Sequence, residues 1–168
     1  MTGAHRLRRP LVLTGLVLLG LAWVPLDAFS RDHALLINAS PSLPNWAFWL
    51  DRKAPIARGS LIFFEPPPSD LVRRHFGSGP QMFGKRVLGL PGDVVSHDGH
   101  TVRINGRTVA TRLDTTRLGV PLTRGPAGPI PADCYYVGTG HPRGLDSRYA
   151  AIGFVCRGRI IGSGRAIL

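Results

Sequence analysis

The sequence predicts a mainly β domain that follows a single apolar N-terminal segment. Its 168 residues suit one domain with a terminal appendage, and 43% of them are hydrophobic, which is enough to build a core. The chain also contains 15 prolines and 21 glycines. Because these residues favour tight turns, we expect short strands joined by many turns rather than long helices.

Apolar runs that end at turn residues locate the predicted elements. The predicted strands cover 60–64, 81–88, 93–96, 101–104, 107–110, 134–138, 152–156 and 159–167. Asp-Gly at 98–99 and Asn-Gly at 105–106 are typical of hairpin turns, so the three strands around them form a meander. A short helix is predicted over 70–76 after Ser69, and a long irregular excursion over 111–131.

The N-terminus predicts the compartment of the domain. Arg6, Arg8 and Arg9 precede an uncharged apolar stretch over 10–26, which a polar approach over 27–41 follows. A positive flank stays in the cytoplasm, so we expect 1–9 to be cytoplasmic, 10–26 to be a transmembrane anchor and 27–168 to lie across the membrane. The stretch over 10–26 has 17 residues, which is at the short end of the ~17–25 needed to cross a bilayer. A cleaved signal peptide that ends near Ser30 is therefore the alternative.

The net charge of +11 does not by itself identify a nucleic-acid-binding protein. The arginines are scattered, with no run longer than a pair, and no basic helix or aromatic-basic stripe is present. We therefore expect membrane lipid rather than nucleic acid as the partner of this charge. Trp46, Phe48 and Trp49 fit either the headgroup region of a membrane or simple core packing.

Cysteine and histidine usage argues against a metal or cofactor site. Cys134 and Cys156 are too few for a zinc cluster; they form either one disulfide or two buried free thiols. His97 and His100 flank a predicted hairpin tip and are interpreted as solvated turn residues. No phosphate loop or dinucleotide fingerprint is present, so we expect no cofactor and no metal.

Lys85 is the predicted general base. It is one of two lysines among 21 basic residues, and arginine, which the chain uses elsewhere, cannot lose its proton. Strand alternation puts Lys85 on one face with Phe83 and Val87, an apolar setting. Burial can lower a lysine pKa by up to ~3–5 units, which would make a neutral amine available. An ordinary surface lysine is the alternative.

Ser42 is the predicted nucleophile. It lies in the turn Ser-Pro-Ser-Leu-Pro over 40–44, where the two prolines exclude helix. A neutral lysine can accept the proton of a serine hydroxyl without help from histidine. The backbone N–H of Ser42 and the hydroxyl of Ser40 are candidate oxyanion donors, although Ser40 also fits an ordinary turn-forming serine.

Asp146 and Arg148 form a third candidate block. An acid two residues before an arginine on an extended segment lies on the same side and can pair with it. Asp146 is further predicted to approach Arg86 or to position the strand that carries Lys85. The alternative is a loop salt bridge of little energetic weight.

In order and in kind, these blocks resemble the membrane-bound signal peptidase family, the Ser-Lys proteases. Residues 40–44 resemble the nucleophile box, 85–93 the base box and 146–149 the closing acid box. The resemblance covers nearly the whole chain. Ser-Leu-Pro followed by the tryptophans is most similar to the TraF branch of conjugative transfer peptidases.

The resemblance implies a signal-peptidase-like fold of coiled antiparallel sheets behind a transmembrane helix, with the domain on the periplasmic side of a bacterial inner membrane. It implies Ser42 as nucleophile, Lys85 as base, Ser40 as an oxyanion donor, and Asp146 with Arg148 as support. The implied substrates are membrane-tethered precursors that carry signal or leader sequences, with conjugative pilins as the expected case.

Two departures from the family pattern leave other functions open. Gly144 stands where the family has a serine that orients the lysine, so a water or Ser147 would have to replace it. Residues 138–141 read Gly-Thr-Gly-His where the family has Gly-Asp-Asn. A catalytically impaired scaffold subunit of a conjugation or secretion apparatus is therefore an alternative. A self-cleaving Ser-Lys repressor is disfavoured by the apolar segment and by the absence of a DNA-binding helical module.

Overall fold

The computed structural model of this chain describes residues 4–38 and 43–168. The predictions for Ser40 and Ser42 fall outside the described residues. The chain divides into two compact units, Met1–Ala34 and Leu35–Leu168, which are treated separately below.

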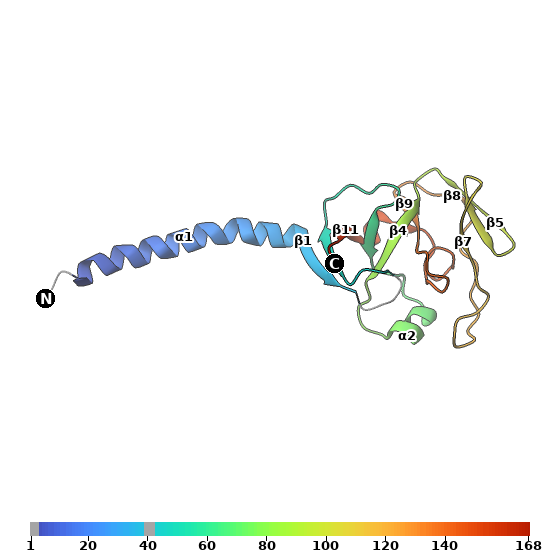
Figure 1. Ribbon diagram of the computed structural model, residues 1–168, viewed down its shortest axis with the longest axis horizontal. Coiled ribbons are helices and arrows are strands. Elements are labelled where there is room, and N and C mark those ends of the chain that lie inside the picture. Colours follow the sequence, from blue (N-terminus) through green and yellow to red (C-terminus); the bar gives the residue numbers. More distant parts are fainter. Residues whose placement is uncertain (1–3, 39–42) are drawn as a thin grey trace. The chain divides into compact units, whose positions relative to one another are not determined.

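The first unit is dominated by one helix, α1 (Ala4–Asp32), drawn in blue in Figure 1. The helix continues beyond the predicted 10–26 segment, and the i,i+4 pair of Asp27 and Arg31 supports its last turns. Many large apolar side chains of α1 are exposed: Val12, Leu13, Leu16, Val17, Leu18, Leu21, Trp23 and Leu26.

Among the residues that the structure describes, no helix is both long enough and apolar enough to cross a membrane.

The second unit is built from two antiparallel sheets, which confirms the predicted mainly β class. The larger sheet has the order β1-β2-β11-β3-β4-β9-β10, and from β2 to β10 its neighbours run antiparallel. Its strands are β1 (His33–Ile37), β2 (Ala47–Asp51), β3 (Leu61–Phe64), β4 (Phe83–Gly89), β9 (Cys134–Gly138), β10 (Val155–Cys156) and β11 (Ile160–Ala166), the last after a 3-10 turn at Arg157–Arg159.

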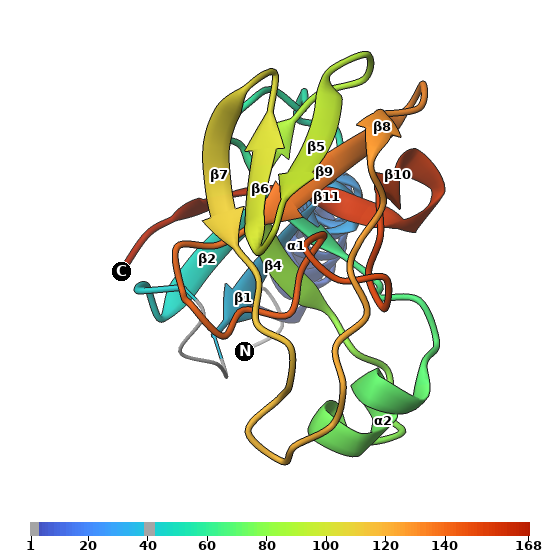
Figure 2. The ribbon, with the colours of Figure 1, turned by 90° about the vertical axis from the view of Figure 1, so that its right-hand side faces the viewer.

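The smaller sheet is the predicted meander with one strand added. Its order is β7-β6-β5-β8, and Figure 2 shows β7, β6 and β5 side by side. Its strands are β5 (Val94–Asp98), β6 (Thr101–Ile104), β7 (Arg107–Thr111) and β8 (Gly128–Pro129). Asn105 and Gly106 both have positive φ, as the Asn-Gly hairpin turn between β6 and β7 requires.

The side chains of strand β9 alternate between two hydrophobic cores, one on each face of the strand. Val137 packs in a core with Ile62, Phe64 and Val87 of the larger sheet. Tyr136 packs on the opposite face with Val95 and other residues of the smaller sheet. Cys134 belongs to this second core and forms a disulfide with Cys156, so the bonded alternative for the two cysteines is confirmed.

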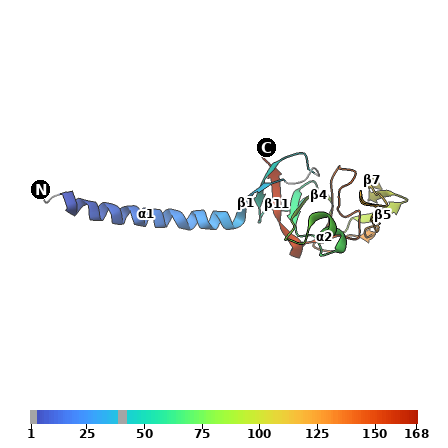
Figure 3. The same ribbon diagram turned by 90° about the horizontal axis from the view of Figure 1, so that it is seen from below.

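Short helix α2 (Asp70–Phe76) begins where the sequence predicts. Ser69 is its N-cap and accepts a hydrogen bond from the backbone N–H of Val72. The helix lies below the two sheets in Figures 1 and 2 and in front of the strands in Figure 3, which is seen from below. The ring of Phe76 packs edge-on against Phe83 of β4.

The structure differs from the predicted strands in two places. The strand predicted over 152–156 is reduced to Val155–Cys156, because Gly153 has a φ of 64° inside a turn that Tyr149 begins. Strands β1 and β2 are not predicted: β1 lies within the expected polar approach over 27–41, and β2 lies in the aromatic segment after Pro44. Of the three aromatics near β2, Phe48 is in the core, which confirms core packing for that residue, and Trp46 is 58% exposed.

Candidate active site

Lys85 lies in the middle of β4, between β3 and β9. Its Cα partner in β3 is Ile62, which is fully buried. Burial alternates along β4, so Phe83, Lys85 and Val87 are buried together while Arg86 is exposed on the other face. The face predicted for Lys85 is therefore confirmed.

The Lys85 amine is in a setting that favours its neutral form. The side chain is 5% exposed, and no carboxylate among the described residues forms an ion pair with it. Desolvation by burial lowers the pKa of Lys85 from its usual value near 10.5. Asp146 acts in the opposite direction and Arg148 reinforces the lowering, but desolvation is the largest contribution.

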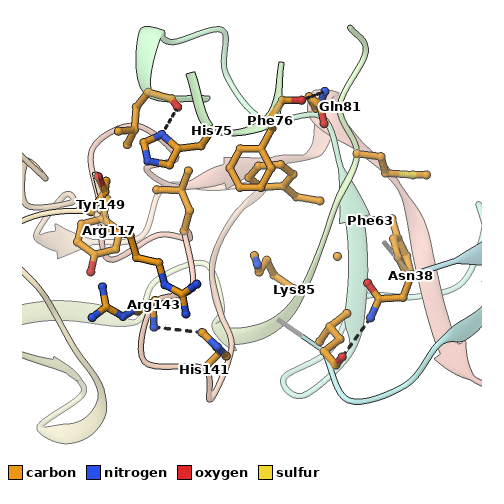
Figure 4. A pocket seen from close by; sticks show the side chains of 18 of the residues that line it. Asn38, Phe63, His75, Phe76, Gln81, Lys85, Arg117, His141, Arg143 and Tyr149 are labelled. Carbon is orange, nitrogen blue, oxygen red and sulfur yellow. Dashed lines mark hydrogen bonds between the residues drawn. The ribbon is translucent and has the colours of Figure 1, made fainter. Parts of the chain in front are cut away.

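Lys85 points into a pocket of about 440 Å³. Figure 4 shows its side chain in the middle of this pocket, with Phe63 and Asn38 on one side and Arg117 and Arg143 on the other. Much of the wall is apolar, including Leu36, Leu43, Phe63, Phe76, Leu122 and Leu145. A mainly apolar pocket around one poised polar group is the usual form of a ligand-binding or active site.

Leu43, the residue that follows Ser42 in sequence, lines this pocket. A Cβ at Gly84, next to Lys85, would lie 3.1 Å from Leu43 Cδ1, so the two segments are in close contact. The Asn38 side-chain amide donates to the carbonyl oxygens of Leu43 and Asn45, at 3.0 and 2.8 Å. These contacts hold the described residues on both sides of 39–42 at the pocket that contains Lys85.

Asp146 and Arg148 form a bidentate ion pair that is almost completely buried. Arg148 Nε donates to Asp146 Oδ1 and Arg148 Nη2 donates to Asp146 Oδ2, each at 2.8 Å. The two residues are 0% and 3% exposed. The predicted pairing is confirmed, but its burial makes it more than the loop salt bridge that was the alternative.

Further hydrogen bonds satisfy both partners of this pair. The Arg148 guanidinium donates to the carbonyl oxygens of Thr111, His141 and Gly144, and Asp146 Oδ2 accepts from the backbone N–H of Thr139. Burial alone would lower the pKa of Arg148, but the hydrogen bond and charge of Asp146 outweigh it and raise that pKa. The pair therefore fixes the loop that forms one wall of the pocket.

Arg86 is not part of this site. Its side chain lies on the exposed face of β4 and donates to the carbonyl oxygen of Gly59 at 3.3 Å. The predicted approach of Asp146 to Arg86 is wrong, because Asp146 is fully buried and pairs with Arg148, whereas Arg86 is exposed. Asp146 instead influences Lys85 on the buried face.

Ser147, one candidate for the hydroxyl missing at Gly144, has a different role. Its Oγ accepts a hydrogen bond from the backbone N–H of Val137 at 2.9 Å, and the residue is fully buried. The side chain thereby attaches the acid-bearing loop to β9.

The excursion over 111–131 contributes a wall that the sequence does not predict. Gly125 N–H donates to the Arg148 carbonyl, and a Cβ at Gly125 would lie 2.2 Å from the Ser147 carbonyl oxygen. Only a glycine permits this approach, which lets Leu113 and Leu122 line the pocket. The leucines of this excursion were the available signal.

The histidines of the hairpin contact the same excursion. His97 Nε2 lies 3.3 Å from the Pro126 carbonyl oxygen, and His100 Nε2 lies 3.7 Å from an oxygen of Asp114. Within the described ranges, no group of three or more His, Cys, Asp or Glu residues is placed to hold a metal ion.

Comparisons with known proteins agree on one family. A family model described as signal peptidase, peptidase S26, matches residues 8–168. The chain is 35% identical over 92 residues to signal peptidase I of Bacillus licheniformis, covering 49% of this chain and 48% of the relative. It is 34% identical over 92 residues to signal peptidase I T of Bacillus subtilis (strain 168), covering 49% and 47%. The matched region is thus about half the length of these curated relatives.

Among solved structures, a signal peptidase I from Enterococcus faecalis is 26% identical with a TM-score of 0.40. The match covers 66% of this chain and 97% of that one.

Proposed function

This chain belongs to the signal peptidase, peptidase S26 family, and we propose that it is a serine endopeptidase with Ser42 as nucleophile and Lys85 as general base. The observation that carries the proposal is the buried Lys85 amine in the middle of a mainly apolar pocket. Burial lowers its pKa, so a larger fraction of the amine is neutral near physiological pH than in an exposed lysine.

Lys85 would move one proton in each half of the reaction. As Ser42 Oγ bonds to the scissile carbonyl carbon, its proton passes to Lys85 Nζ; the ammonium then gives that proton to the leaving amine as the C–N bond breaks. Water attacks the acyl-enzyme while Lys85 accepts its proton, and the proton returns to Ser42 Oγ. The Ser42 backbone N–H and the Ser40 hydroxyl would stabilise the oxyanion, each by roughly 2.7–4 kcal/mol.

We assign the buried Asp146 and Arg148 a supporting part in this reaction. Their ion pair holds the loop that contains Gly144 and Leu145 against the pocket. Arg148 also opposes protonation of Lys85 by charge repulsion, whereas Asp146 favours it. The pair thus places two opposite charges near the base without making an ion pair with it.

The proposed substrates are exported precursors that carry a signal or leader sequence. The apolar walls of the pocket suit an apolar peptide segment, and the curated relatives are named signal peptidases. Within this class we propose pilin precursors of a conjugation system. The support for that choice is the Ser-Leu-Pro motif followed by Trp46 and Trp49.

We further propose that residues 10–26 anchor the chain in a bacterial inner membrane, with 1–9 in the cytoplasm and 27–168 on the periplasmic side. The support is the uncharged stretch that follows Arg6, Arg8 and Arg9. The chain should remain in the membrane pellet after carbonate extraction, and protease added outside spheroplasts should degrade the domain. N-terminal sequencing that begins near residue 30 would show a cleaved signal peptide instead.

The catalytic proposal is tested with the full chain in detergent micelles and a pilin precursor as substrate. Ser42→Ala and Lys85→Ala should each abolish cleavage, whereas Lys53→Ala, at the other and exposed lysine, should leave it unchanged. Equal cleavage by all four proteins would exclude the Ser-Lys pair. No cleavage of the pilin or of a signal-peptide precursor by any of them would favour the scaffold alternative.

A further inference from the structure

One side of the pocket carries positive charge that the proposed reaction does not use. Arg117 and Arg143 both line the pocket, and Figure 4 shows them together on the side of Lys85 away from Phe63. Both are exposed, and neither side chain forms a hydrogen bond or an ion pair within the described residues. No Asp or Glu is found among the described residues that line this pocket. The pocket therefore holds two cations that no carboxylate of its own wall balances.

The acids nearest to the two arginines in sequence already have partners. Asp114, three residues before Arg117, pairs with Arg112 at 2.9 Å. Asp146, three residues after Arg143, is buried in its ion pair with the guanidinium of residue 148. Each of these carboxylates is committed to another cation. The positive charge on this side of the pocket is thus available to a ligand.

The turn that contains Arg117 is ordered by its own hydrogen bonds. Thr115 and Pro121 form an antiparallel bridge that closes the turn. Inside it, the backbone N–H of Thr116 donates to the Val120 carbonyl oxygen at 2.9 Å, and Thr116 Oγ1 accepts from the Val120 N–H at 3.3 Å. These bonds fix the backbone from which the Arg117 side chain extends.

The loop that contains Arg143 is held by the buried Arg148. The backbone N–H of Arg143 donates to His141 Nδ1 at 3.1 Å. Arg148 Nη2 donates to the carbonyl oxygens of His141 and Gly144, at 3.0 and 3.2 Å, and its Nη1 donates to the Thr111 carbonyl oxygen at the start of the excursion. One buried residue thereby ties both cationic segments to the domain. A site whose backbone is already ordered loses little entropy when a ligand binds.

The apolar side of the pocket is expected to hold the part of the substrate that becomes the acyl group. Leu43 follows Ser42 in sequence, and a Cβ at Gly84 would lie 3.1 Å from Leu43 Cδ1 and 2.9 Å from Phe63 Cε1. An acyl group on Ser42 therefore starts on this side. In the proposed reaction, Lys85 gives its proton to the leaving amine from the middle of the pocket. The substrate residues that follow the scissile bond then continue toward the two arginines.

We propose that Arg117 and Arg143 form a specificity site for an acidic side chain, Asp or Glu, that closely follows the scissile bond of the substrate. This inference rests on the proposed Ser-Lys function. Guanidinium groups donate charge-assisted and often bidentate hydrogen bonds to a carboxylate. The two arginines lose no internal partner when they do so, and they take no part in the proton transfer. The site selects among precursors by the charge of the segment that leaves.

The test uses the full chain in an uncharged detergent and a matched set of quenched fluorescent peptides. All share an Ala-x-Ala sequence and carry Asp, Asn or Lys at the first, second or third residue after the scissile bond. At one of these positions the Asp peptide should have a kcat/KM roughly five- to tenfold above that of the Asn peptide, as two partly exposed charge-assisted contacts provide. The Lys peptide should be the poorest. Added salt should narrow these differences.

Arginine variants assign the preference to the two residues. Arg117→Gln and Arg143→Gln should each reduce the ratio of Asp to Asn cleavage, and the double variant should bring it near one. Arg86→Gln removes an exposed arginine outside the pocket and should keep the wild-type ratio. Replacing both pocket arginines by Glu should reverse the order, so that the Lys peptide is cleaved better than the Asp peptide. Thermal unfolding of the Gln variants should match the wild type, because the side chains are exposed.

Three results would overturn the proposal. The first is equal cleavage of the Asp, Asn and Lys peptides by the wild-type chain at all three positions. The second is a variant that loses the same fraction of activity on every peptide, which would show that the arginines do not read substrate charge. The third is an effect of the arginine variants that appears only when phosphatidylglycerol is added to the micelles, which would assign the charge to a lipid headgroup.

A binding measurement separates this inference from the proposed function. Fluorescence anisotropy of labelled Asp and Asn peptides with the Ser42→Ala chain requires no cleavage, and the Asp peptide should bind more tightly. If Lys85→Ala cleaves as well as the wild type does, the Ser-Lys function fails, whatever the peptides show. If cleavage depends on Lys85 while the Asp and Asn peptides bind equally and are cleaved equally, the function stands and the specificity site fails.

Discussion

Lys85 and Arg86 are adjacent in β4, yet the pleat of the strand places them on opposite faces. Lys85 is 5% exposed inside a pocket, whereas Arg86 is exposed and donates to the Gly59 carbonyl oxygen. Burial lowers the pKa of Lys85. A guanidinium keeps its proton in a protein, so Arg86 can supply only charge. Of these two residues, only Lys85 combines an amine with a buried setting, which is why we propose it as the base.

The buried face differs from the exposed one in how it accommodates charge. Asp146 and Arg148 are compensated by each other and by a closed set of hydrogen bonds. On the outside, pairs such as Arg73 with Asp70 remain more than half exposed to water. Buried charge is either paired, as in Asp146 and Arg148, or disfavoured by desolvation, as at Lys85.

Exchanging the two cations of β4 should give the largest effect. Lys85→Arg should reduce cleavage by roughly 10²–10⁴-fold, since arginine cannot serve as a base. Arg86→Lys should leave the rate unchanged, because that position faces solvent. Steady-state cleavage of a quenched fluorescent peptide with an Ala-x-Ala sequence measures both. A Lys85→Arg protein that cleaves near the wild-type rate would place the base elsewhere.

Breaking the buried ion pair should have the next largest effect. Arg148→Ala leaves the Asp146 carboxylate buried and unpaired, which should lower the free energy of unfolding by about 3–5 kcal/mol. Arg73→Ala, in the exposed pair of α2, is the matched control and should change it little. Urea denaturation of both variants measures the difference. Equal midpoints for the two variants would show that burial does not distinguish the pairs.

Removing the disulfide should separate stability from chemistry. The bond joins residues 22 apart in sequence, so replacing Cys134 and Cys156 together by alanine should lower the stability by about 3 kcal/mol. Cys134 lies in the core on the other face of β9 from Lys85. The cleavage rate at a temperature where the variant is folded should therefore be unchanged. A large fall in kcat with an unchanged unfolding midpoint would connect the disulfide to the site.

The smallest effect should be a pH dependence of stability that comes from Lys85. Its pKa is lowered in the folded state, so between that lowered pKa and 10.5 the unfolded chain binds more protons than the folded one. The Lys85 contribution to stability therefore rises with pH across this window and is least favourable below it. Lys85→Met should be more stable than the wild type at low pH, with the gap narrowing toward pH 10.5. Thermal unfolding across pH tests this, and a gap that widens with pH would contradict it.

Several features of the fold and the site could be predicted because they depend on neighbours in the chain. The Asn-Gly pair at 105–106 sets a hairpin through its backbone preferences, and Ser69 caps α2 through a hydroxyl three residues from its partner. The alternation around Lys85 has the same local origin, since side chains in a strand change faces at every step. The expected pairing of Asp146 with Arg148 likewise spans only two residues.

Other features could not be predicted because they depend on which segments the fold brings together. The expected approach of Asp146 to Arg86 is wrong, and the pocket walls formed by Leu113 and Leu122 are not predicted. Both features depend on contacts between residues that are distant in sequence. The open question about the cysteines had the same origin. It was answered by the register that sets Cys156 against Cys134.

By itself, the sequence determined the kind of chemistry: one lysine among apolar strand residues, a serine between prolines, and an acid beside an arginine. The tertiary structure decided how that lysine is surrounded. It buried Lys85 and set it against Ile62, because the register of β3 with β4 joins residues 23 positions apart. Residue types and local periodicity are properties of the sequence itself. Burial and register arise only when strands distant in sequence pair and exclude water.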